Sequence, residues 1–81
     1  MSSLNSISNK KLIKALEKQS YFITRQKGSH VRLTCTLYNK THHITIPEHS
    51  PLKIGTLHGI LKEVAEHLQI AKSELIILLG L

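Results

Sequence analysis

The chain has 81 residues, of which 41% are hydrophobic, a length and composition that fit one small globular domain and exclude a disordered segment. Eleven lysine and arginine residues stand against five acidic ones, and the formal net charge is +6. A basic surplus of this size favours polyanionic partners, namely RNA, DNA, anionic lipid or an acidic protein, and leaves the fold undetermined. We expect a single domain over residues 1–81.

The only cysteine, Cys35, cannot form an intrachain disulfide, and one free thiol fits a reducing cytoplasm. Residues 1–5 lack the charged and apolar regions of a signal peptide. The longest apolar run, residues 75–79, is too short to span a bilayer, so we expect a cytoplasmic protein without a membrane segment.

The first predicted element is a helix near residues 9–19, capped by Ser8 and carrying an apolar stripe. Three strands follow at about 21–26, 30–38 and 41–46. The first two are joined by a hairpin at Lys27-Gly28-Ser29, and the second and third by a turn at Asn39-Lys40. Pro47 ends the third strand because it cannot donate a ladder hydrogen bond. Three strands with short turns predict an antiparallel meander.

Alternation along the second strand separates a polar face from a core face. The polar set is His30, Arg32, Thr34 and Thr36, and the core set is Val31, Leu33, Cys35 and Leu37. In the third strand, Ile44 and Ile46 point to one side, and His43 and Thr45 to the other. The core face requires helical cover, and the basic face is left open to solvent or a ligand.

A second helix is predicted from a cap at Thr56 to about residue 68, since its apolar residues follow the i, i+3, i+4, i+7 rule. Gly59 inside it suggests a close approach to the sheet. Ser73 is expected to cap a short last helix over residues 74–79, whose apolar side chains are too many for one buried stripe. The fold class is therefore α+β: an α-β-β-β-α, double-stranded-RNA-binding-like two-layer sandwich with a short C-terminal helix.

The stretch from Arg25 to Arg32 combines three basic side chains, a glycine turn, a hydroxyl and a histidine. The ordinary histidine pKa of about 6.5 suits general acid–base work near neutral pH. His30 is therefore a candidate base for the 2′-hydroxyl of RNA, assisted by Lys27, Arg32 and an anion-binding nest at Gly28-Ser29. The alternative is a surface histidine that makes an ordinary hydrogen bond.

Three motifs in order make the chain similar to the HicA family of toxins. They are Tyr21-Phe22 with Arg25-Gln26-Lys27-Gly28-Ser29-His30, then Ile46-Pro47-Glu48-His49, then Gly55-Thr56-Leu57-His58-Gly59-Ile60-Leu61. The resemblance implies a metal-independent endoribonuclease toxin that cleaves mRNA with His30 as its catalytic residue and is held by a HicB-like antitoxin. The expected RNA-binding residues are Lys27, Gly28, Ser29, Arg32 and His49, with no metal or cofactor.

Other interpretations of the histidines and of the whole chain stay open. His49 fits a phosphate-binding or catalytic role, or a structural hydrogen bond in its loop. His42, His43 and His58 suggest a metal, but no carboxylate or cysteine is spaced to join them, and adjacent strand residues face opposite ways. His67 is expected to be structural. As a whole, the chain also fits a non-catalytic RNA-binding module or a protein-interaction domain.

Overall fold

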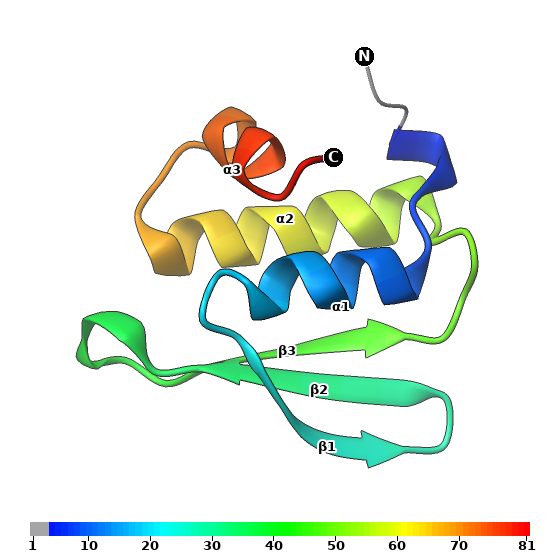
Figure 1. The fold of residues 1–81 in the computed structure, drawn as a ribbon, viewed down its shortest axis with the longest axis horizontal. Helices are drawn as coiled ribbons and strands as arrows, with labels where there is room; N and C mark the ends of the chain where they lie inside the picture. The colour runs from blue at the N-terminus through cyan, green and yellow to red at the C-terminus, as the bar shows by residue number, and fades with distance from the viewer. Residues whose placement is uncertain (1–3) are drawn as a thin grey trace.

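The structure is a computed structural model that describes residues 4–81 as a helix, a three-stranded antiparallel sheet and two further helices (Figure 1). The elements are α1 (Asn9–Glu17), β1 (Phe22–Lys27), β2 (His30–Cys35), β3 (His42–Pro47), α2 (Ile54–Leu68) and α3 (Lys72–Leu78), with short 3₁₀ turns η1 (Leu4–Ser6) and η2 (Leu37–Asn39). The sheet order is β1-β2-β3. The predicted α+β class and the α-β-β-β-α order with a short terminal helix are confirmed.

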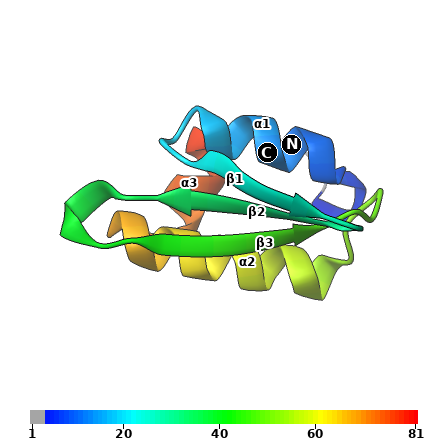
Figure 2. The ribbon, with the colours of Figure 1, turned by 90° about the horizontal axis from the view of Figure 1, so that it is seen from below.

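The helices lie on one face of the sheet. Figure 1 shows the strands below α1 and α2, with α3 on the far side of these helices from the sheet. Figure 2, seen from below, shows the three strands uncovered on the opposite side. Apart from Leu37, the side chains predicted to form the core are buried: Val31, Leu33, Ile44 and Ile46 of the sheet, and Leu57, Ile60, Leu61 and Val64 of the apolar stripe on α2. The buried Cys35 thiol also lies in this core, as expected.

The register of β1 contains a β-bulge that decides which of its side chains join the basic face. Phe22 pairs with Thr34 and Arg25 pairs with Arg32, so two residues lie between these positions on β1 but only one lies between their partners on β2. The extra residue is Thr24. A bulge reverses the alternation beyond it, so Arg25 lies on the same face as Arg32 rather than on the core face.

The predicted length of the second strand is wrong. β2 ends at Cys35, and the chain reverses through η2, where Tyr38 and Asn39 have φ values of 62° and 56°. Two successive left-handed residues end the ladder before the predicted Asn39-Lys40 turn. Leu37 consequently leaves the core face of the strand and is 40% exposed.

Two of the three predicted helix caps are also wrong. Ser8 caps α1 as expected, because its Oγ accepts a hydrogen bond from the Lys11 N–H at 3.1 Å. α2 begins earlier than predicted, with Lys53 at the cap, and Thr56 lies inside its first turn. Buried Leu52, whose N–H donates to the Ile7 carbonyl at 2.8 Å, fixes the chain just before this start.

At α3 the cap position is Ala71 rather than Ser73. Alanine offers no side-chain acceptor, so the hydrogen bond at this end comes from Glu74 instead. Its Oε1 accepts from the Ala71 N–H at 3.3 Å. Glu74 thereby satisfies a backbone donor and lies favourably at the positive end of the helix.

Gly59 does not mark a close approach to the sheet, since a Cβ added there meets no atom within 4 Å and the residue is exposed. Gly59→Ala should therefore raise the unfolding free energy by about 0.5–1 kcal/mol, because alanine loses less backbone entropy in a helix. Urea unfolding measures the change. Gly80→Ala is the matched control, because φ is 71° at that position and no gain is expected there. A loss of stability in Gly59→Ala would contradict the open space around this residue.

Candidate functional site

The uncovered side of the sheet carries a set of mostly polar and basic side chains, which we call the open face. Its members are Phe22, Thr24, Arg25 and Lys27 on β1, His30, Arg32 and Thr34 on β2, and His43 and Thr45 on β3. The cross-strand pairs arrange them in rows. Lys27 pairs with His30, and the next row is Arg25, Arg32 and Thr45.

These two rows enclose an open depression of about 300 Å³, lined by Arg25, Lys27, His30, Arg32 and Thr45. No carboxylate lines it, and within residues 4–81 none lies within ion-pair distance of its three cations. Unpaired cations around a concave surface attract anions. Guanidinium groups are suited to phosphate because they donate two parallel hydrogen bonds.

His30 lies at the end of this depression, as the first residue of β2. The preceding turn has Gly28 at φ 58°, a left-handed value that glycine adopts without strain in a two-residue hairpin. The His30 side chain is exposed, and its Nδ1 lies 3.4 Å from Ser29 Oγ, a long and weak contact. Its imidazole is therefore available to a ligand, with Lys27 directly across the hairpin.

The loop that bears His49 is attached to the same end of the sheet. His30 pairs with Pro47, and the Glu48 N–H donates to the Ser29 carbonyl at 2.7 Å. The His49 N–H in turn donates to the Pro47 carbonyl at 2.9 Å. The His49 side chain is exposed and does not line the depression. The structure thus places His49 near the hairpin but outside the group around His30.

Arg25 and Thr45 line the depression although the motif analysis did not assign them to the site. The strand register explains why the sequence did not indicate Arg25. Counting back from the Lys27–His30 pair places Arg25 on the polar face, whereas counting forward from the buried Tyr21 places it on the core face. The two counts agree only if the strand contains a bulge.

Two threonines hold a second histidine on the open face. Thr24 Oγ1 lies 2.7 Å from Thr34 Oγ1, which lies 2.8 Å from His43 Nδ1. The neighbouring His42 points to the other side of the sheet, as the alternation predicts. Within residues 4–81 no group of three histidine, cysteine or acidic side chains is placed to hold a metal ion.

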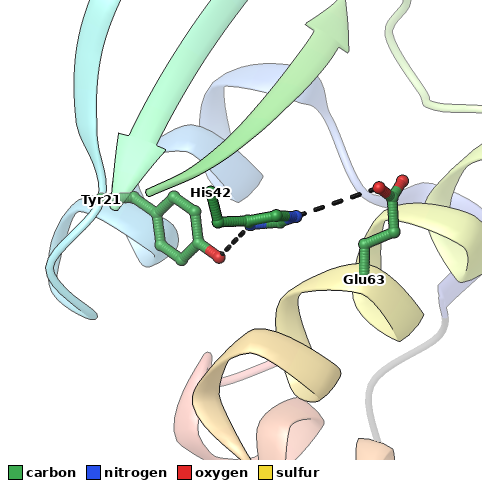
Figure 3. Close-up of polar contacts among 3 residues, drawn as sticks. All are labelled: Tyr21, His42 and Glu63. Atoms are coloured by element: carbon green, nitrogen blue, oxygen red, sulfur yellow. Dashed lines mark hydrogen bonds and ion pairs between the residues drawn. The ribbon is translucent and has the colours of Figure 1, made fainter. Parts of the chain in front are cut away.

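A separate polar cluster lies where β3 meets α2 (Figure 3). The Tyr21 hydroxyl is 2.7 Å from His42 Nδ1, and His42 Nε2 is 3.9 Å from Glu63 Oε1. The ring of His67 stacks on that of His42, with centroids 5.0 Å apart. Burial raises the pKa of the Tyr21 phenol, and Cys35 and Glu63 raise it further. Tyr21 therefore stays protonated and donates to His42.

His67 packs among these rings, and its Nε2 is buried without a hydrogen-bond partner. Desolvation lowers the pKa of His67, and the neighbouring His42 and Lys40 lower it further. Folding therefore favours the neutral form of His67. The expectation that His67 is structural agrees with this packing between aromatic rings, since it makes edge contacts with Tyr21 and Tyr38.

The lowered pKa predicts a pH dependence of stability. The unfolded chain binds a proton at His67 near pH 6.5, whereas the folded chain binds it only at lower pH. Acidification below about pH 6.5 should therefore reduce the unfolding free energy until the folded pKa is passed. Denaturant unfolding between pH 7.5 and 4.5 measures this loss. His67→Gln, which does not titrate, should reduce it, and an unchanged pH profile in that variant would contradict the assignment.

Comparison with known proteins identifies a family that this chain matches. The family model described as HicA toxin of bacterial toxin–antitoxin matches residues 10–65. This range runs from α1 into α2 and includes the three strands, the hairpin and the whole open face. No curated protein and no solved structure is significantly similar to the chain. No helix within residues 4–81 is both long and apolar enough to cross a membrane.

Proposed function

The chain belongs to the HicA toxin family of bacterial toxin–antitoxin systems, and from this membership we propose that it is an endoribonuclease that cleaves mRNA in the cytoplasm without a metal ion. The observation that carries the proposal is the depression in which His30 lies beside Arg25, Lys27 and Arg32. A histidine among unpaired cations is suited to metal-independent cleavage of a phosphodiester.

In the proposed reaction, His30 removes the proton from a ribose 2′-hydroxyl. The 2′ oxygen then attacks the adjacent phosphorus, a new P–O bond forms and the bond to the 5′ oxygen breaks. The leaving 5′ oxygen takes a proton from solvent, to which the depression is open. The products are a 2′,3′-cyclic phosphate and a 5′-hydroxyl, so water is not consumed and no oxidant or metal is needed.

The phosphorane that forms on attack carries more negative charge than the phosphodiester. Arg25 and Arg32 are cross-strand partners, and Lys27 is the partner of His30, so three cations surround the space beside the imidazole. The cations are held by the sheet before substrate binds, and preorganised charges of this kind stabilise a transition state more than water does. RNA-binding roles for Gly28, Ser29 and His49 belong to the same proposal, because the hairpin and its attached loop border His30.

The test uses a labelled single-stranded RNA incubated with the purified chain in EDTA. Cleavage should yield 2′,3′-cyclic phosphate ends, and an RNA with a 2′-deoxy residue at the cut should resist cleavage there. Cleavage that depends on added metal would contradict the mechanism. RNA binding without cleavage would instead identify the chain as a non-catalytic RNA-binding module.

A toxin of this kind harms its own cell unless a partner restrains it, and we propose a HicB-like antitoxin that covers the depression with acidic groups. Arg32→Glu should then weaken the complex at least about tenfold, measured by isothermal titration of the purified partner. Lys62→Glu, on the exposed side of α2, makes the same charge change and should have little effect. Equal binding by Arg32→Glu would place the antitoxin elsewhere, for example on the exposed Ile77 and Leu78.

A further inference from the structure

Beyond the depression, the open face carries one large aromatic side chain. Phe22 is 63% exposed, although a phenylalanine of a small domain normally contributes to its core. We propose that Phe22 is the stacking platform for an unpaired RNA base at a distance from the cut, in a subsite completed by Thr34 and His43. The inference rests on the proposed function, because it takes single-stranded RNA as the ligand and His30 as the site of cleavage.

The sheet register places Phe22 on the open face. Phe22 pairs directly with Thr34, and Thr34 pairs on its other side with His43. Thr34 is thus the centre of a row of three residues, one from each strand. Its side chain lies on the opposite side of the strand from Val31, Leu33 and Cys35. The Phe22 ring therefore lies on the same side of the sheet as the basic depression. Thr34 is itself buried, so its part in the row is to hold His43 rather than to contact a ligand.

The other end of the row is held in place by hydrogen bonds. Thr24 and Thr34 are 2.7 Å apart at their hydroxyl oxygens, and Thr34 is 2.8 Å from His43 Nδ1. If Thr24 donates to Thr34 and Thr34 donates to His43, the imidazole proton is on Nε2. That atom then serves as a fixed donor in the same row as Phe22, one strand beyond Thr34, and it is suited to a base edge or a phosphate oxygen. Fixing these groups before binding reduces the entropy that a ligand must remove.

The distance along β2 fits a nucleotide strand that crosses the depression. His30 and Thr34 are four residues apart, which corresponds to about 13 Å in a strand. Between them lies the row of Arg25, Arg32 and Thr45. The backbone of an RNA cut at His30 would pass the two arginines and bring a base from a neighbouring nucleotide over Phe22. Single-stranded RNA is commonly bound in this way, with phosphates on cations and bases on aromatic rings.

The neighbours of Phe22 favour RNA over an apolar protein segment. The adjacent row supplies Arg25 and Arg32, and the next supplies Lys27, so the ring borders cations without a neighbouring carboxylate in the depression. By contrast, Ile77 is 79% exposed on α3, on the far side of the helices from the sheet. An apolar segment of a partner protein would bind no better at Phe22 than at Ile77. A base linked to phosphates would bind better at Phe22, because the neighbouring cations attract the phosphates.

The sequence contains no tryptophan, so Phe22→Trp introduces a single fluorescent reporter at the proposed platform. The measurement uses the His30→Ala background, in which RNA stays intact, and titrates a short single-stranded RNA at low salt. Stacking of a base should quench the tryptophan emission. Ile77→Trp in the same background is the control and should show no quenching at equal RNA occupancy. Absence of quenching in Phe22→Trp while the RNA is bound would overturn the proposal.

A second measurement separates stacking from a structural role of Phe22. Phe22→Ala should weaken RNA binding roughly 5- to 150-fold, the range found for loss of one base–aromatic stack. A series of RNAs with one abasic residue each should contain a position where loss of the base weakens binding to the Phe22 protein but not to Phe22→Ala. If no such position exists, Phe22 does not stack with a base. Quenching in Phe22→Trp and base-dependent binding, together with a wild-type chain that leaves RNA uncut, would retain the subsite and reject the nuclease proposal.

Discussion

Replacement of His30 by alanine is expected to remove most RNA cleavage and leave the fold intact. A positioned general base typically contributes 10²–10⁴-fold to a rate, so cleavage should fall by about that factor. The His30 side chain is exposed and makes only the weak Ser29 contact, so its loss should change the unfolding free energy by less than about 1 kcal/mol. The melting temperature and the rate of cutting of a long single-stranded RNA, both in EDTA, check the two statements.

RNA binding should survive in the same variant. The phosphate contacts come from Arg25, Lys27 and Arg32, which the substitution leaves in place. A salt-dependent affinity close to that of the wild type would therefore separate a loss of chemistry from a loss of substrate. His58→Ala, on α2, is the matched control, because it removes a histidine outside the open face and should cut RNA normally.

Full activity in a folded His30→Ala chain would reject the mechanism and make His49 the next candidate base. His49→Ala then becomes the decisive comparison, since the His49 loop is bound to the hairpin through the Glu48–Ser29 hydrogen bond. An unfolded His30→Ala chain would show instead that the histidine is structural. The exposure of His30 argues against this last outcome.

β2, β3 and the larger helices could be predicted from the sequence because each has a strong hydrophobic period, whereas β1 was predicted from its aromatic and β-branched residues. Alternation assigned Val31, Leu33, Ile44 and Ile46 to one face, and this face is the buried one. The turn after Cys35 could not be predicted in the same way. Leu37 continues the alternation, but Tyr38 and Asn39 adopt left-handed backbone angles that nothing in their side chains requires.

The starts of α2 and α3 show a different limit of prediction from sequence. Thr56 and Ser73 are good capping residues, yet the helices begin before them, at Ile54 and Lys72. Capping contributes about 1 kcal/mol, which tertiary contacts can outweigh. At α2 the competing contact is the burial of Leu52, and at α3 it is the Glu74 hydrogen bond to the Ala71 N–H. Local propensity alone therefore misplaced the α2 cap by three residues and the α3 cap by two.

Which side chains meet around the depression could be predicted only in part. A motif identifies residues next to each other in sequence, and Lys27 and Arg32 indeed line the depression with His30. Arg25 joins them because the bulge at Thr24 shifts the register, and Thr45 joins them because β3 pairs with β2. Both depend on pairing between strands, which a local pattern does not record.

Leu61→Ala is expected to cause the largest loss of stability. Leu61 is fully buried on the face of α2 that packs against the sheet, within the single hydrophobic core. Truncating such a leucine removes its transfer free energy and leaves a cavity, with a cost of about 2–5 kcal/mol. For a domain of this size, each kcal/mol lowers the melting temperature by about 4–8 °C, so a fall of at least about 8 °C is expected. The loss is a large share of the total free energy of unfolding, because small domains are only marginally stable.

The neighbouring residue provides the matched control for this prediction. Lys62 is exposed on the same turn of α2, so Lys62→Ala should change the melting temperature by no more than a few degrees. The pair therefore tests the helix register directly, because a rotation of α2 by one residue would exchange the two effects. Equal melting temperatures for Leu61→Ala and the wild type would mean that α2 presents another face to the sheet. The assignment of the open face would then need revision, because it depends on the helices covering the other side of the sheet.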